Sequence, residues 1–261
     1  MFNLEKLVQL LENYAPLELS RKMIEKGDYD NSGVIVNNHD YVKGVLFTLD
    51  LTEIAVDKAL ELGCDTIITH HPAIYNPIKS LGETQDTFAL LKAVKSNLNV
   101  LSMHLNLDVA DCGIDFELAK GLGAKQTHIL DYLDETHGYG REFSVEKIAL
   151  DEFVKKVEKV FGSDKIIAYG CENVCKIASF CGGGSSHALS EVANKTTNAD
   201  TIVTSDIPHH VLLALVNMKR NVIILPHYVS ENYGFNKFYA CVAGQLPKDV
   251  KAHYFTDKRF M

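Results

Sequence analysis

Two adjacent histidines at the end of an apolar run are the residues of this chain best suited to chemistry. The β-branched run 66–69 is followed directly by His70, His71 and Pro72. This pattern is typical of a buried strand whose carboxyl end opens onto a site, and the proline, which has no backbone donor, ends the strand. Imidazole is the commonest protein ligand for transition metals. We therefore expect a metal site here, against the alternative of two surface histidines in a loop.

Other histidines and carboxylates also come just after predicted strands, where open α/β sheets place their sites. They are His104 and Asp108 in the first half of the chain and Asp206, His209, His210, His227 and Glu231 in the second. If a helix begins after Pro226, His227 and Glu231 project from one face, so they can bind one metal, or the carboxylate can bridge two. Such ligands suit zinc or iron, and manganese less well. Two ions ~3.5–4 Å apart would be the hydrolytic arrangement.

Strands and helices alternate along the chain, which predicts an α/β fold with mostly parallel sheets. Asp50 and Thr52 stand where a helix cap would stand, and 131–135 is expected to be a solvated loop. The expected strands are 34–36, 45–50, 66–69, 100–104, 166–169, 177–180, 201–204 and 222–225. The expected helices are 3–13, 53–62, 88–96, 115–121, 150–161, 189–195, 211–218 and one after residue 226.

The two halves of the chain resemble each other. The run 64–69 (CDTIIT) matches 199–204 (ADTIVT), 99–101 matches 221–223, and 45–50 would pair with 177–182. The matching segments share a sequence and follow one another in the same order. This indicates two versions of one structural unit rather than chance similarity between strands. We predict two similar, interlinked α/β units with the metal site between them: 1–127 plus 228–261, and 128–227.

The composition limits the classes of function. The chain has 261 residues, 46% of them hydrophobic, and a net charge of −8, which argues against nucleic-acid or anionic-membrane binding through bulk electrostatics. No signal peptide is apparent and no apolar run reaches about 18 residues, so we expect a cytoplasmic protein without a membrane span. The six cysteines include no Cys-x-x-Cys pair and are expected to be reduced; Cys171 and Cys175 could form half of a metal site.

Several short motifs together resemble the NIF-three-like family, whose dinuclear-metal members are named GTP cyclohydrolase 1 type 2 homologues. The resemblance covers nearly the whole chain, because the motifs run in family order from residue 30 to residue 231. They are Asp30–Gly33, Ile67–Pro72, Lys79–Leu81, His104 with 106–108, Gly182–Ser185, and His227-Tyr228 with Ser230-Glu231.

The resemblance implies a ligand set, a metal content and an assembly. The implied ligands are His70, His71, Asp108, His227 and Glu231. They would hold two divalent ions per subunit, zinc, iron or manganese, in a toroidal homohexamer. We expect His104 to orient Asp108 or a bound water. At this length the chain has no room for the third domain that some members insert.

The chain departs from the family pattern at two places. Leu105 stands where threonine is usual, which affects a supporting hydrogen bond, and Ser205 and Pro208 alter the second-half motif around Asp206 and His210. Substrate contacts there are expected to differ from the family's. The turn formed by Gly182, Gly183, Gly184 and Ser185 could cradle a phosphate on its N–H groups or could be only a tight turn.

Three functions remain open from the sequence. The first is a metal-dependent hydrolase acting on a nucleotide or a related small molecule, as the family name suggests. The second is a metal-handling or cofactor-assembly protein. The third is an interaction scaffold in which metals hold the fold or the ring.

Overall fold

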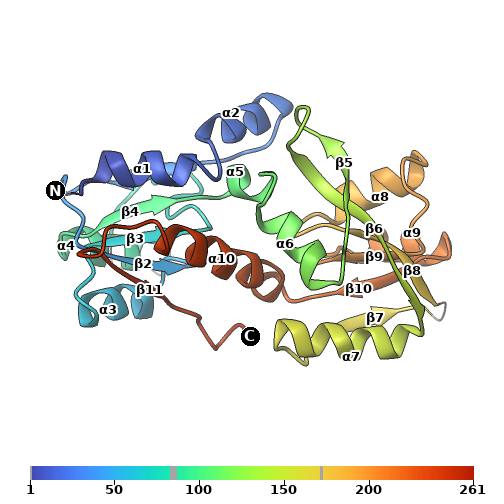
Figure 1. Ribbon diagram of the computed structural model, residues 1–261. Coiled ribbons are helices and arrows are strands. Elements are labelled where there is room, and N and C mark those ends of the chain that lie inside the picture. Colours follow the sequence, from blue (N-terminus) through green and yellow to red (C-terminus); the bar gives the residue numbers. More distant parts are fainter. Residues whose placement is uncertain (1, 83–86, 171–172) are drawn as a thin grey trace. The chain divides into compact units, whose positions relative to one another are not determined.

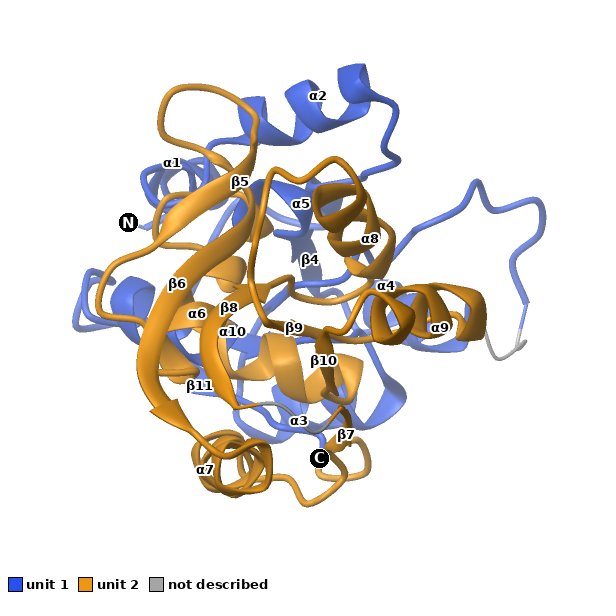
Figure 2. Cartoon of the chain, turned by 90° about the vertical axis from the view of Figure 1, so that its right-hand side faces the viewer, with its two compact units in different colours: residues 1–107, 235–257 blue, residues 108–234, 258–261 orange. Residues whose placement is uncertain are grey.

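The computed structural model describes residues 2–82, 87–170 and 173–261 (Figure 1). The chain forms two compact units, residues 1–107 with 235–257 and residues 108–234 with 258–261 (Figure 2). These bounds differ from the predicted ranges, because 108–127, 228–234 and 258–261 fall in the second unit. The reason for the first difference is helix α6 (Ile114–Gly121), which packs on strands β6 and β8 of the second sheet.

The first unit is built on a five-stranded sheet with the strand order β1-β4-β3-β2-β11. Strand β1 runs antiparallel to β4, and the other pairings are parallel. Every residue of β2, β3 and β4 is buried, as expected for parallel strands covered on both faces. The strands are β1 (Gly33–Val36), β2 (Gly44–Thr48), β3 (Thr66–Thr69), β4 (Asn99–Ser102) and β11 (Lys251–Tyr254).

Most helices of the first unit match their predicted positions. They are α1 (Leu4–Glu12), α2 (Leu17–Lys26), α3 (Glu53–Glu61), α4 (Phe88–Lys95), the short α5 (Leu105–Asp108), whose last residue belongs to the second unit, and the carboxyl-terminal part of α10 (His227–Ala243). Helix α2 and strand β11 were not predicted. Strand β11 is short and half-exposed, so it gives little apolar signal. Helix α2 is amphipathic, with Leu19 and Met23 buried, but this pattern was not used to predict a helix.

The second unit has a six-stranded sheet with the order β5-β6-β8-β9-β10-β7. Strands β8, β9 and β10 are parallel, and the outer strands pair antiparallel. The strands are β5 (His128–Tyr132), β6 (Gly138–Ile148), β7 (Ile167–Tyr169), β8 (Val174–Ser179), β9 (Thr201–Thr204) and β10 (Asn221–Ile224). The helices are α6, α7 (Leu150–Phe161), α8 (Ser185–Ala193), α9 (His209–Asn217) and the first turns of α10.

The prediction of a solvated loop at 131–135 is wrong for its first residues. Asp131 and Tyr132 belong to β5, which forms a hairpin with the long strand β6. Strand β5 lies at the edge of its sheet and is half-exposed to exposed along its length. It therefore keeps polar side chains, and the sequence lacks the apolar pattern that would predict a strand. Within the described residues, no helix has the length and apolarity that crossing a bilayer requires.

The two units repeat the same three-strand frame in the same register, which confirms the internal similarity. In the first unit Val45 pairs with Thr66, and Thr66 with Asn99. In the second unit the corresponding residues Ile177, Thr201 and Asn221 pair in the same way. The carboxyl ends of these strands therefore meet at one edge of each sheet.

An aspartate before the middle strand fixes this register in both units. Asp65 accepts a hydrogen bond from the backbone N–H of Lys43 at 2.9 Å. Asp200 accepts from the backbone N–H groups of Cys175 and Lys176 at 3.1 and 2.8 Å. In each case the donors stand at the start of the neighbouring strand, so one carboxylate ties two strands together.

A buried charged pair lies in the core of the second unit. Asp115 of α6 is fully buried, and its Oδ2 lies 3.9 Å from Nε of Arg141, a fully buried residue of β6. The backbone N–H of Cys181 donates to Asp115 Oδ1 at 3.1 Å. Burial raises the pKa of Asp115 to about 6, although the arginine and the backbone donors favour its charged form.

Because the folded state raises this pKa, protonated Asp115 favours folding below about pH 4, and that stability is lost as the pH rises through about 6. We expect the free energy of unfolding of the wild type, relative to Asp115→Asn, to fall by on the order of 2 kcal/mol between pH 4 and pH 7. Urea denaturation in chelator across this range measures it. Asp151→Asn, which changes an exposed carboxylate of α7, is the control. An identical pH dependence for Asp115→Asn and the wild type would contradict the expectation.

Candidate metal centre

Three histidines gather at the strand ends of the first unit. His70 and His71 follow β3 and His104 follows β4, and each offers a ring nitrogen within 4.8 Å of the others. His70 is fully buried, whereas His71 and His104 are partly exposed. Three imidazole nitrogens at this spacing can hold a transition-metal ion.

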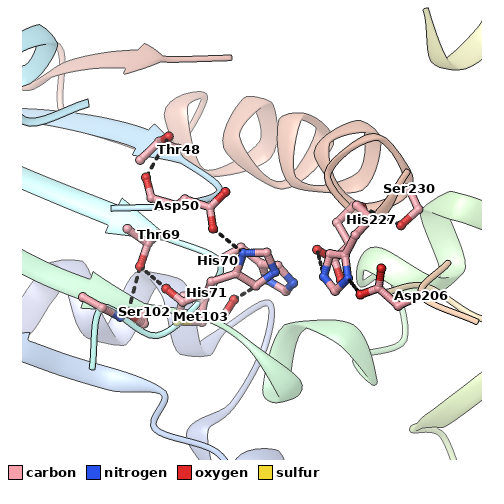
Figure 3. A network of polar contacts seen from close by, with 12 residues as sticks. Thr48, Asp50, Thr69, His70, His71, Ser102, Met103, Asp206, His227 and Ser230 are labelled. Carbon is pink, nitrogen blue, oxygen red and sulfur yellow. Dashed lines mark hydrogen bonds and ion pairs between the residues drawn. The ribbon is translucent and has the colours of Figure 1, made fainter. Parts of the chain in front are cut away.

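A hydrogen bond fixes the tautomer of each histidine of the His70-His71 pair (Figure 3). His70 Nδ1 lies 2.7 Å from the carbonyl oxygen of Met103, and His71 Nδ1 lies 2.7 Å from Oδ1 of Asp50. Carbonyl and carboxylate oxygens only accept hydrogen bonds, so each Nδ1 carries the hydrogen and each neutral ring keeps its lone pair on Nε2. Metal-binding histidines are oriented in this way.

The segment Asp30–Ser32 fixes the tautomer of His104 and also accepts a hydrogen bond from its backbone N–H. Asp30 Oδ1 accepts from His104 Nδ1 at 2.8 Å, and Ser32 Oγ accepts from the backbone N–H of His104 at 3.0 Å and donates to Asp30 Oδ2. Burial alone would raise the pKa of Asp30, but the hydrogen bonds from His104, Ser20 and Ser32 outweigh it and lower the pKa. The carboxylate therefore stays charged and orients the ring of His104 through Nδ1.

In the second unit His227 and Glu231 lie on one face of α10, as predicted. His227 Nε2 lies 3.1 Å from Glu231 Oε2, one helical turn away. His227 Nδ1 lies 2.5 Å from Oδ2 of Asp206, which has a positive φ of 35° at the end of β9 (Figure 3). A fourth histidine is thus oriented by an acceptor on its Nδ1. Asp206, which was predicted as a substrate contact, thus lies beside the predicted ligand His227.

Two buried carboxylates of the second unit lie close together. Asp108 and Glu231 are 5% and 3% exposed, and each offers an oxygen within 4.8 Å of the other. Carboxylates this close repel each other in a buried environment, and a bound cation relieves that cost.

Cys181 Sγ donates to Asp108 Oδ1 at 3.5 Å. Burial raises the pKa of Cys181 well above the ordinary thiol value, and the nearby Asp108 adds to this, so the sulfur keeps its hydrogen.

The glycine turn is shaped by close packing. A Cβ on Gly182, whose φ is 53°, would lie 2.3 Å from Oε1 of Glu231, and a Cβ on Gly184 would lie 2.5 Å from Cβ of Phe180. A side chain at Gly182 would therefore displace Glu231. Gly183 has open space, and Ser185 Oγ donates to the carbonyl of Asp206 at 3.3 Å. A phosphate cradle at this turn stays a prediction.

Two other predicted positions, His210 and Cys175, are exposed. His210 is exposed in the first turn of α9, and its role in substrate binding stays a prediction. Cys171 lies outside the described residues, and Cys175 is exposed on β8, so half of a metal site at this pair stays untested.

Sequence reasoning did not assign an orienting role to the residues that hold the histidines. Asp50 and Thr52 were both assigned to a helix cap, but only Thr52 caps α3, by accepting from the backbone N–H of Ala55. Asp50 instead orients His71. The expectation that sites lie at the carboxyl ends of strands could have identified Asp50, because it follows β2 as the histidines follow β3. Asp30 was named only as part of a family motif, and its position gave no such signal because it follows no strand.

Comparison with known proteins agrees with these observations. The model of the Duf34/NIF3 (NGG1p interacting factor 3) family matches residues 2–259. A Clostridium acetobutylicum protein named GTP cyclohydrolase 1 type 2 homolog is 31% identical over 232 residues, which are 86% of this chain and 84% of the relative. A Clostridium perfringens protein of the same name is 26% identical over 95% of this chain and 94% of its own length.

Solved structures share the fold. A Bacillus cereus protein related to NIF3 superimposes with a TM-score of 0.86 at 20% identity, covering 98% of this chain and 97% of its own. A Staphylococcus aureus protein gives a TM-score of 0.85 at 24% identity over the same shares. Since the family model spans nearly the whole chain, the protein belongs to the Duf34/NIF3 family.

Proposed function

We propose that this protein binds two divalent metal ions per chain and is a metal-dependent hydrolase of a nucleotide or a related small molecule. One observation carries the proposal: each of the four histidines has its Nδ1 against a carbonyl or carboxylate oxygen. His39 and His137 also have Nδ1 beside an oxygen acceptor. The contact supports a metal site here because His70, His71 and His104 in addition bring ring nitrogens within 4.8 Å of one another. This arrangement leaves Nε2 as the electron-pair donor of His70, His71 and His104, as in metal sites, whereas Nε2 of His227 lies beside the carboxylate of Glu231.

The proposed ligands are His70 and His71 from the first unit and Asp108, His227 and Glu231 from the second. Joining the two sets into one dinuclear centre is part of the proposal and rests on the resemblance to dinuclear family members. Nitrogen donors with carboxylates suit zinc, iron or manganese. When bound, the ions would supply Lewis acidity and lower the pKa of coordinated water.

The chain's own residues would have separate tasks in such a centre. Asp50, Asp206 and the Met103 carbonyl would hold the imidazoles in position, and His104, held by Asp30, would orient Asp108 or a water molecule. The names of the clostridial relatives support a purine nucleotide as the substrate class, with the glycine turn, Asp206 and His210 as proposed substrate contacts.

The first test of this function is metal content together with turnover. We expect protein purified without chelator to contain about two ions per chain by elemental analysis, and to hydrolyse GTP or a simple phosphoester at that content. His128→Ala, an exposed histidine on β5, should leave the metal content unchanged. A value near zero after metal supplementation would contradict the metal site. Two ions without turnover on any substrate would favour metal handling or a scaffold role.

The second test separates a bridging carboxylate from a ligand of one ion. A carboxylate has two oxygens to share, whereas an imidazole has one available nitrogen, so we assign Glu231 as the bridge. We expect Glu231→Gln to lower occupancy at both metal positions and His71→Ala to leave one position largely filled. Anomalous peak heights from crystals of the two variants measure this, with Glu152→Gln on α7 as the control. Two full-height peaks in Glu231→Gln would exclude the bridge.

We include a ring of six copies in the proposal, on the family resemblance alone. The mass of one chain is 29.0 kDa, and light scattering of the metal-loaded protein should report about six times this value. A monomer at micromolar concentration would rule out the ring.

A further inference from the structure

Two tyrosines of the first unit pack against each other while remaining largely exposed. Tyr29 is 46% exposed and Tyr75 is 49% exposed. Their ring centroids lie 5.1 Å apart with an interplanar angle of 67°, an edge-to-face pair. Aromatic pairs usually stabilise a fold through the surface that they bury. A pair with nearly half of its surface in water indicates an apolar surface kept for a ligand.

The pair adjoins the three histidines of the same unit. The ring of Tyr75 lies 6.1 Å from the ring of His104, at an interplanar angle of 84°. The tyrosine therefore contacts the histidine held by Asp30, and a ring resting on Tyr75 would lie beside the proposed metal ligands of this unit.

The segment that carries Tyr75 also encloses a cavity. A volume of about 570 Å³ is lined by residues of the segment 72–80, including Tyr75, Asn76, Lys79 and Ser80, and by Thr87. This size lies within the usual range for small-molecule sites. Among the described lining residues, Lys79 is the one that carries a charge, and its side chain is exposed.

Hydrogen bonds hold this segment near the site. The side-chain amide of Asn31 donates to the carbonyl of Ile74 at 2.8 Å, and the backbone N–H of Ala73 donates to Ser102 Oγ at 3.2 Å. Asn31 stands between Asp30 and Ser32, the two residues that hold His104. One short segment therefore binds both the histidine and the residue next to Tyr75.

We propose that Tyr29 and Tyr75 form a stacking platform for a planar heteroaromatic ring, and that Lys79 pairs with an anionic group on the same ligand. The inference deepens the proposed function, on which it rests for the metals beside His104. Stacking on aromatic side chains favours any planar base, whereas an ammonium group favours phosphate or carboxylate. The two features together select a ligand that has both a planar ring and a negatively charged group.

The test uses three probes on the metal-loaded protein: guanosine 5′-monophosphate, guanosine and ribose 5-phosphate. Calorimetry would measure their binding to the wild type, Tyr75→Ala, Tyr75→Phe, Tyr29→Ala and Lys79→Ala. We expect Tyr75→Ala and Tyr29→Ala to weaken both guanine probes by about tenfold and leave ribose 5-phosphate unchanged. Lys79→Ala should weaken the two phosphate probes and spare guanosine. Tyr75→Phe, which keeps the aromatic face, should bind like the wild type.

Tyr132→Ala is the matched control, because Tyr132 is a tyrosine of β5 in the other unit and is 55% exposed. The inference is overturned if the wild type binds none of the probes, or if both tyrosine variants bind guanosine within twofold of the wild type. Metal analysis of the same samples separates the two proposals. Normal metal content with no effect of the tyrosines defeats only the platform. Tyrosine-dependent probe binding without metals defeats only the metal function.

Discussion

The hydrogen bond from an imidazole Nδ1 to a fixed oxygen acceptor is the interaction on which the candidate centre depends. Without it a histidine can rotate or change its tautomer, and its lone pair loses a defined direction. The acceptors differ in kind: a backbone carbonyl for His70, and carboxylates for His71, His104 and His227. A carboxylate acceptor also makes the imidazole a stronger donor to a cation, so the same contact sets both geometry and basicity.

The parallel strands explain how residues far apart in sequence reach each other within a unit. Asp50, the His70-His71 pair and His104 each follow one of three adjacent parallel strands, and in-register pairing brings the three strand ends to one edge. The helices between the strands add no functional side chain to this group. Their contribution is to bury the strands on both faces, which leaves the strand ends as the place where polar groups can gather.

The sequence predicted the parallel framework well because burial makes its strands uniformly apolar and short. Strands β2, β3 and β9 and helix α7 lie where the pattern placed them. The hairpin of β5 and β6 was missed, because an edge strand in contact with water keeps polar side chains and loses the apolar signal. The histidines of the site could be found from their type and position. The role of Asp30, which was named only within a family motif, could not be predicted, since it depends on a contact between residues 74 positions apart.

The shared register of the two units shows how far one frame can diverge at its strand ends. The position of Asp50 in the first unit corresponds to Gly182 in the second, and that of His71 corresponds to Asp206. An aspartate at position 182 would displace Glu231, because a Cβ there would lie 2.3 Å from its Oε1. If the halves arose by duplication of an ancestral unit, the copies have become non-interchangeable: the space that one uses for an orienting carboxylate is used in the other to admit a glutamate. A chimera that repeats the first unit twice would therefore keep the frame and lose the carboxylate-rich half of the chemistry.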